Sequence, residues 1–196
     1  MIDAFEKIQI AIHASNKQAS KTVAKEIADL IQSRAKEGKN CVLGLATGST
    51  PKTLYAELVR MHREEGLSFK NVVSFNLDEY YPMQPDAAQS YHRFMHTCLF
   101  SHIDIDQKNV HIPDGTIAKQ DINQYAAAYE RAIDDAGGID IQILGLGLNG
   151  HIGFNEPKTS RNSITRIAAL ENSTRLANAY EFDNISQVPR LSLTMG

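Results

Sequence analysis

The sequence predicts an α/β protein with a doubly wound, mostly parallel sheet and helices on both faces, a Rossmann-like arrangement. Two observations support this prediction. Short apolar runs alternate with longer segments of helical periodicity along the 196 residues, and strands separated by helices pair in parallel. Three apolar runs also lead directly into polar or glycine-rich segments, as loops at the carboxyl edge of such a sheet do. The length suits one domain, residues 1–196.

The first predicted elements are a strand and a helix. Residues 7–13 alternate apolar and polar side chains, which predicts a strand. Residues 17–36 have helical periodicity, and Gly38 follows them as a helix C-terminal signal. The expected apolar face of this helix comprises Ala19, Val23, Ile27, Leu30 and Ile31.

A second strand leads into a turn suited to binding an anion. Residues 41–46 form a continuous apolar run, and a helix is expected over 51–66 with Pro51 in its first turn. The turn between them consists of Thr47, Gly48, Ser49 and Thr50. Free amide groups, hydroxyls and the positive end of the helix dipole would converge there. The segment lacks the Gly-Lys pair of a nucleotide-binding P-loop. A plain capped turn is the alternative.

The next strand ends in adjacent acidic residues. Residues 71–77 predict the strand, and Asp78 and Glu79 follow it directly, before Tyr80 and Tyr81. If the strands are parallel, Asp78 lies at the same sheet edge as the turn after residue 46. The alternative is that Asp78 merely caps the following turn.

The middle of the chain supplies two helices and two strands. We expect a loop over 82–89, helices over 90–100 and 121–136, a short strand over 109–112 and a buried strand over 139–144. His92 and His96 have the i,i+4 spacing of some metal sites, but no Glu or Cys completes a recognisable ligand pattern. We therefore favour ordinary histidines and expect no metal.

A glycine-rich segment with three polar side chains follows the strand at 139–144. Glycine allows left-handed backbone and close approach to a ligand. Residues 145–157 contain four glycines, and among them lie Asn149, His151 and Glu156. An amide, an imidazole and a carboxylate in such a loop predict a functional site. A tight turn with capping side chains is the alternative.

The C-terminal part predicts further structure up to the last residue. Residues 164–170 are expected to be a strand or an extended segment, 173–181 a helix and 190–195 a strand, followed by Gly196. Because an apolar strand leading into a glycine rarely closes a domain, we expect the domain to be incomplete at its C-terminus.

Composition narrows the class of function. The net charge of −3 gives no basic field for nucleic acid. Cys41 and Cys98 lie in apolar settings and make no disulfide framework, which fits a reducing compartment. No apolar run has the length of a membrane span, and the first residues lack a signal-peptide core. We expect a cytoplasmic protein without nucleic-acid or membrane partners.

Several motifs resemble the glucosamine-6-phosphate deaminase family. They occupy residues 43–51, 75–80, 90–91, 147–157 and 173–178. The resemblance implies conversion of glucosamine 6-phosphate and water to fructose 6-phosphate and ammonia without a cofactor. The expected partner is a small sugar phosphate, and because many family members are oligomers, a homo-oligomer is a further expectation.

The resemblance also implies a role for each candidate residue. Thr47, Gly48, Ser49 and Thr50 would hold the phosphate group. His151 would move a proton to open the sugar ring, while Asn149 and Glu156 orient it, with Glu156 a candidate acceptor for its second N–H. Asp78 would take the proton from C2 and return it to C1. An imidazole suits the first step because its pKa lies near neutrality.

The sequence differs from the family pattern at two points, and two functions other than deamination stay open. The family carries a basic phosphate-binding residue where this chain has Tyr180, and a lysine from beyond position 196 reaches the phosphate; Arg175 or Lys158 could compensate. A 6-phosphogluconolactonase-like hydrolase would use His151 but not Asp78. A sugar-phosphate-sensing module would need neither for proton transfer.

Overall fold

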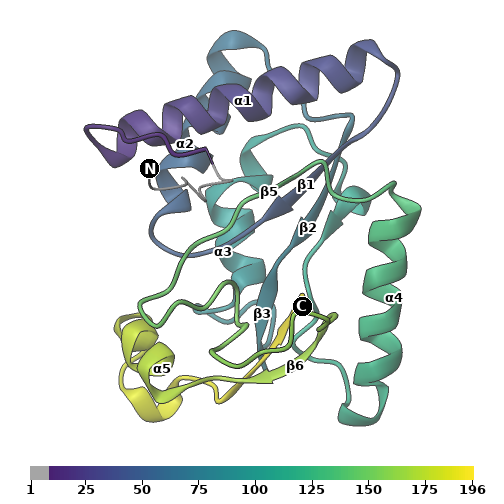
Figure 1. The fold of residues 1–196 in the computed structure, drawn as a ribbon. Helices are drawn as coiled ribbons and strands as arrows, with labels where there is room; N and C mark the ends of the chain where they lie inside the picture. Colours follow the sequence, from purple (N-terminus) through teal and green to yellow (C-terminus); the bar gives the residue numbers. More distant parts are fainter. Residues whose placement is uncertain (1–8) are drawn as a thin grey trace, which may run out of the picture.

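A parallel sheet forms the centre of the structure, a computed structural model that describes residues 9–196 (Figure 1). Its strand order is β4-β2-β1-β5, and all neighbouring pairs are parallel. The four strands are β1 (Cys41–Leu45), β2 (Val72–Asn76), β4 (Val110–His111) and β5 (Ile141–Gln142). The carboxyl ends of these strands therefore share one edge of the sheet, as predicted.

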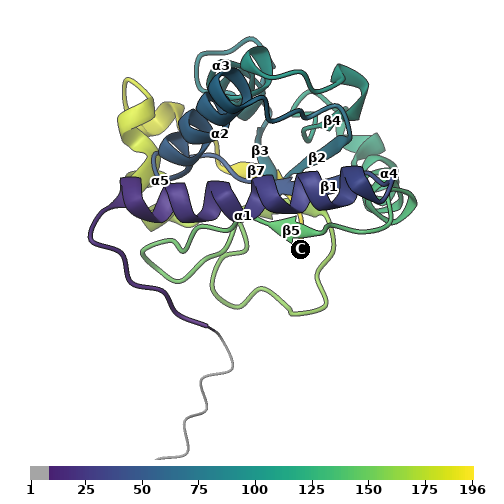
Figure 2. The same ribbon diagram turned by 90° about the horizontal axis from the view of Figure 1, so that it is seen from above.

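Helices cover both faces of this sheet because the central strands are apolar on both sides. Alternate residues of β1 point to opposite faces: Cys41, Leu43 and Leu45 pack against one group of helices, and Val42 packs on the other side against Tyr129 and Ile133. The first group consists of α1 (Asn16–Lys36), α2 (Pro51–Glu65) and α3 (Tyr91–Cys98). The other face is covered by α4 (Ile122–Asp135), which is seen nearly end-on at the right of Figure 2.

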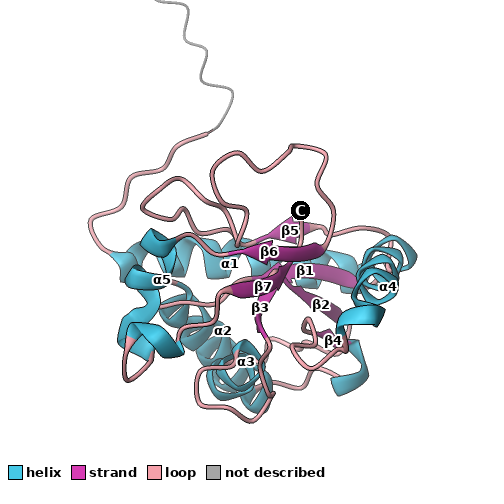
Figure 3. Ribbon diagram, turned by 90° about the horizontal axis from the view of Figure 1, so that it is seen from below, coloured by secondary structure: helices cyan, strands magenta, loops and turns pink. Residues whose placement is uncertain are grey.

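A second sheet, which the sequence analysis did not predict, continues from the first. It is antiparallel, with strand order β3-β7-β6 (Figure 3). Its strands are β3 (Asp78–Tyr81), β6 (Arg166–Ala169) and β7 (Leu191–Thr194), and α5 (Asn172–Asn178) lies beside them. Only Leu77 separates β2 from β3. Its N–H donates to the Leu45 carbonyl at 2.8 Å, and its carbonyl accepts from Met195 N–H at 2.9 Å, so Leu77 joins the two sheets.

Two predicted strands are wrong as stated. Of the strand expected at 7–13, residues 7 and 8 lie outside the described part, and 9–13 form no strand. Ile10 and Ile12 are 70% and 93% exposed, because no neighbouring strand or core receives them. The strand expected at 139–144 is confined to β5, which is only half-buried and pairs with β1 alone among the described strands.

The other predicted helices and strands are confirmed to within a few residues. Ser90 begins α3 as its N-cap, with its Oγ accepting from Arg93 N–H at 2.9 Å. Gly66 ends α2 in the left-handed conformation. Cys41 is buried in the core, and Cys98 packs at its margin. Within residues 9–196, no helix combines the length and apolar character needed to cross a membrane.

Candidate active site

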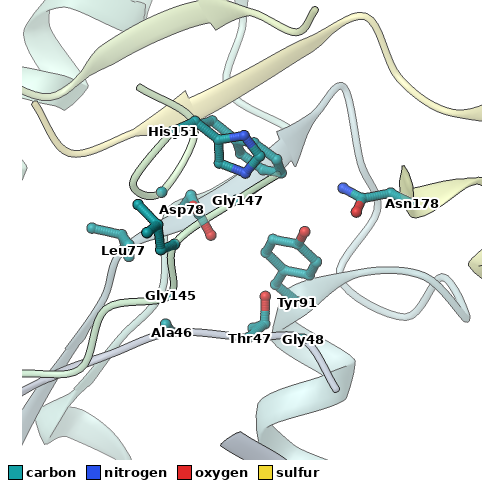
Figure 4. Close-up of a pocket in the computed structure, with 13 residues that line it drawn as sticks. Ala46, Thr47, Gly48, Leu77, Asp78, Tyr91, Gly145, Gly147, His151 and Asn178 are labelled. Atoms are coloured by element: carbon teal, nitrogen blue, oxygen red, sulfur yellow. The ribbon is translucent and has the colours of Figure 1, made fainter. Parts of the chain in front are cut away.

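The three polar segments meet in one cavity at the carboxyl edge of the parallel sheet (Figure 4). The cavity measures about 180 Å³. Thr47 and Gly48 line it from the turn after β1, Asp78 from the start of β3, and His151 from the loop after β5. Sequence reasoning predicted this convergence from the order of strands alone.

The turn after β1 presents unused amide groups. Gly48 has φ of 112°, a conformation that strongly favours glycine. The N–H groups of Thr47, Gly48, Ser49 and Thr50 donate no hydrogen bond to any other residue in the range 9–196. Thr50 is the N-cap of α2 but makes no side-chain capping bond, so the first turn of that helix is open to a ligand. Ser49 and Thr50 line a larger adjoining cavity rather than the one around Asp78. This arrangement suits a phosphate group.

Asp78 is a buried carboxylate without a partner. Its side chain points into the cavity in Figure 4, and the residue is only 6% exposed. The carboxylate makes no hydrogen bond or ion pair with another described residue. Burial, and secondarily the negative charge of Glu79, raise the pKa of Asp78 well above its ordinary value. A carboxylate in this state is a proton acceptor whose conjugate acid is readily formed.

The imidazole of His151 is held by Asn149. The Asn149 amide nitrogen donates to Glu156 Oε2 at 2.8 Å, which turns its oxygen toward the histidine. Asn149 Oδ1 lies 2.6 Å from His151 Nδ1, whereas Glu156 Oε2 lies 3.7 Å from it. Because Asn149 Oδ1 can only accept, Nδ1 carries a proton and Nε2 is left free to accept one. The acceptor of the histidine N–H is therefore Asn149, which corrects the assignment of that role to Glu156.

Glu156 supports the histidine from behind Asn149. It is 8% exposed, and Oε1 accepts from the Glu171 N–H at 3.0 Å. Partial burial acts to raise its pKa, but hydrogen bonds from Thr174, Asn149 and the Glu171 amide outweigh that effect and hold the pKa below its usual value. Glu156 is thus an anion that fixes the orientation of Asn149.

Close packing fixes the position of the histidine ring. A Cβ placed on Gly147 would lie 2.2 Å from His151 Cε1, so the imidazole rests directly against the bare backbone of this glycine. The Gly147 N–H also donates to the His151 carbonyl at 2.9 Å. The glycine-rich loop therefore provides the space that the imidazole occupies.

Two further residues line the cavity that residue patterns did not single out. Tyr91, at the start of α3, and Asn178, at the end of α5, form the wall opposite the loop after β5 (Figure 4). Asn178 Nδ2 donates to the hydroxyl of Tyr80 at 3.0 Å. Both residues lie inside motifs that carry the family resemblance, which was the only signal for them.

The proposed compensating cations do not reach this site. The guanidinium of Arg175 is buried and donates to the carbonyls of Ile185 and Val188, each at 2.9 Å from Nη2. Lys158 lines neither cavity. Tyr180 lines the adjoining cavity together with Ser49 and Thr50, and it is 70% exposed. The rings of His92 and His96 lie with centroids 4.6 Å apart and planes tilted by 34°, and both residues line another cavity than Asp78 does.

An α/β fold with an open phosphate turn and a carboxylate–imidazole pair at one sheet edge defines a class of sugar-phosphate enzymes. Residues 14–195 match the family described as glucosamine-6-phosphate isomerases/6-phosphogluconolactonase, and the chain belongs to that family. A solved structure of a monomeric glucosamine-6-phosphate deaminase superimposes with a TM-score of 0.91 at 41% identity, covering 96% of this chain and 76% of that one.

Two relatives show how the chain compares in length. It is 47% identical over 174 residues to the glucosamine-6-phosphate deaminase of Thermoanaerobacter sp. (strain X514), covering 89% of this chain and 68% of the relative. It is 44% identical over 196 residues to a putative glucosamine-6-phosphate deaminase-like protein of Bacteroides thetaiotaomicron, covering all of this chain but only 30% of that protein.

Proposed function

We propose that the protein converts glucosamine 6-phosphate and water to fructose 6-phosphate and ammonia. The observation that carries the proposal is the unpartnered carboxylate of Asp78 in the same cavity as His151. An aldose–ketose proton transfer needs a base that can reach a carbon-bound proton, and Asp78 is the buried side chain free for that work. The family membership and the deaminase relatives support the same reaction.

The first step is opening of the sugar ring. His151 accepts a proton at Nε2 from the C1 hydroxyl and returns it to the ring oxygen, while Nδ1–H stays on Asn149 Oδ1. Glu156 behind Asn149 stabilises the transient imidazolium. The product of this step is the open-chain aldehyde, which makes the proton on C2 acidic.

Proton transfer and loss of ammonia follow. Asp78 takes the proton from C2 while the C1 carbonyl oxygen gains a proton from solvent, giving an enolic intermediate. Asp78 then returns its proton to C1, which leaves an iminium group at C2. Water adds to that carbon, one of its protons passes to the nitrogen and one to solvent, and ammonia leaves, which completes the ketone. The Asp78 carboxylate is buried, and an electrostatic interaction at a buried site is stronger than in water. The role of the turn formed by Thr47, Gly48, Ser49 and Thr50 is to hold the phosphate group at the far end of the substrate.

Ammonia release from glucosamine 6-phosphate tests the proposal. We would measure it with the 196-residue chain, with any natural continuation beyond Gly196, and with Asp78→Asn in each. We expect ammonia from the unchanged protein and none above background from Asp78→Asn, while a thermal shift shows that the variant still binds the sugar phosphate. Equal turnover by Asp78→Asn would contradict the role of Asp78. Hydrolysis of 6-phosphogluconolactone without ammonia release would contradict the reaction itself.

A further inference from the structure

Glu79 is a buried carboxylate for which the proposed reaction has no use. It follows Asp78 on β3, and because side chains alternate across a strand, the two carboxylates point to opposite sides. Asp78 lines the active-site cavity, whereas Glu79 lines a separate cavity behind β3 with His92 and Asp114. Glu79 is 1% exposed. A charge buried so deeply is costly unless its surroundings compensate for it.

Backbone amides supply part of this compensation, but burial outweighs them and raises the pKa of Glu79 to about 7. Glu79 Oε1 accepts from Tyr80 N–H at 2.8 Å and from Tyr91 N–H at 3.0 Å, and Oε2 accepts from His92 N–H at 2.9 Å. No cationic side chain in the range 9–196 forms an ion pair with it, although its neighbourhood includes the acidic Asp114. Tyr91 and His92 open α3, so the carboxylate sits at the positive end of that helix. A glutamine at position 79 would have one oxygen that accepts hydrogen bonds. Its NH₂ group would face a backbone N–H, and two donors cannot form a hydrogen bond.

The amides held by Glu79 belong to a wall of the active site. Tyr91 lines the cavity, and its ring stacks on Phe154 with centroids 6.0 Å apart and planes 13° apart. Phe154 lines the same cavity from the loop after β5. One side chain on β3 therefore joins the strand that carries Asp78 to the helix that carries Tyr91.

We infer that Glu79 is a positioning residue, which clamps the first turn of α3 to β3 and so fixes Asp78 and Tyr91 relative to one another. The inference rests on the proposed reaction, because the benefit of the clamp is a fixed distance between the base and the opposite wall. Displacements of about 1 Å in such geometry reduce turnover by as much as about 100-fold.

The clamp also brings a negative charge next to the base. Burial is the larger cause of the raised pKa of Asp78, and the charge of Glu79 raises it further. The other titratable side chains near Asp78 are tyrosines on four elements and the histidine across the cavity: Tyr55, Tyr80, Tyr91, Tyr129 and His151. All five are retained when Glu79 is replaced by glutamine, so that variant removes the Glu79 charge and no other. Loss of the Glu79 charge should therefore lower the pKa of Asp78 and extend activity to lower pH.

Three variants separate clamp, charge and helix capping. Glu79→Gln removes the charge, Glu79→Asp keeps it on a shorter arm, and Ser90→Ala removes the other cap of α3, whose Oγ accepts from Arg93 N–H. In Glu79→Gln we expect kcat to fall by about 10- to 100-fold and the acidic limb of the pH profile to move to lower pH. In Glu79→Asp we expect a similar loss without movement of the limb. In Ser90→Ala the limb should also stay in place.

Hydrogen exchange provides a readout that does not depend on turnover. We would follow amide exchange of a peptide containing Tyr91 and His92 by mass spectrometry, without substrate. Faster exchange in both Glu79 variants is expected. Unchanged exchange overturns the clamp, and an acidic limb that coincides for Glu79→Gln and the unchanged protein overturns its electrostatic part. If the unchanged protein releases no ammonia, the proposed reaction fails, and the exchange data alone confirm or overturn the clamp.

Discussion

The Asp78 side chain is buried without a hydrogen-bond donor from residues 9–196, which is an unfavourable state for a single carboxylate. A carboxylate in a cavity normally finds a hydrogen-bond donor, and Asp78 has none among the described residues. Its neighbour Glu79 receives three amide donors from the same region of the chain. The fold thus satisfies the carboxylate that faces the helix and leaves the one that faces the cavity unsatisfied.

The absence of a side chain at Gly147 leaves room for the His151 ring. Gly147→Ala would place a methyl group 2.2 Å from His151 Cε1, so the imidazole must rotate away from Asn149. Because only a side chain has to move, the unfolding midpoint should change little, whereas kcat should fall by about 100-fold. Steady-state kinetics and thermal unfolding measured together check this. A variant with full kcat would show that the packing of the ring on Gly147 is unimportant.

At the scale of elements, α5 is held in place by a buried arginine. Arg175 donates from Nη2 and Nε to the carbonyls of Ile185 and Val188, which lie in the segment between α5 and β7. The Ile185 carbonyl also accepts the Val188 N–H at 3.2 Å, whereas the Val188 carbonyl has no donor other than Arg175 among the described residues. Asn178, three residues further along, reaches the cavity through the same helix. Arg175 is therefore a structural support of the site and not a phosphate ligand.

Replacement of Arg175 should destabilise the fold. Arg175→Ala leaves the buried Val188 carbonyl without a donor and removes one of the two donors of the Ile185 carbonyl, and we expect a loss of about 1–3 kcal/mol in the free energy of unfolding. Arg175→Lys can restore one of the bonds and should lose about half as much. Urea denaturation with the unchanged protein as reference measures both. If Arg175→Ala instead weakened only phosphate binding at unchanged stability, its assignment to phosphate recognition would be restored.

Local pattern predicted most elements but not the pairing of strands. The helices have both periodicity and end signals in the sequence, as the Ser90 cap and Gly66 show. From the sequence alone, residues 78–81 are expected to follow the end of a strand. Nothing local reveals that β7, more than a hundred positions later, pairs with them. The alternation at 7–13 misled for the same reason: its described part has no partner strand. In the site, spacing located His151, Asn149 and Glu156, but only geometry showed which of the two partners accepts its proton.

At the scale of the whole molecule, the buried acids make stability depend on pH. The pKa of Asp78 is raised in the folded state by burial and by Glu79, so the folded state binds this proton more tightly than the unfolded chain does. The contribution of Asp78 to the free energy of unfolding is most favourable below the pKa of the unfolded chain, about 3.9. It falls as pH rises from there to the raised folded value, and stays reduced above it.

Asp78→Asn should therefore gain more stability over the unchanged protein at pH 8 than at pH 4.5. Burial raises the pKa of Asp78 to about 8, and each pKa unit corresponds to about 1.4 kcal/mol, so we expect a gain of at least about 2 kcal/mol at pH 8. Urea denaturation of both proteins at the two pH values checks this. An equal difference at both values would mean that the gain comes from a new hydrogen bond and not from the lost charge.

The junction at Leu77 has a consequence for how substrate preference can diverge. The phosphate turn is built on the parallel sheet, while Asp78 and the strands beside it are built on the antiparallel one, and Leu77 touches both through single backbone bonds. Substitutions that reshape β6 or β7 leave the turn formed by Thr47, Gly48, Ser49 and Thr50 intact. We expect relatives of this chain to differ in the sugar that they accept, through changes in the antiparallel sheet. The phosphate group of the substrate should be common to them.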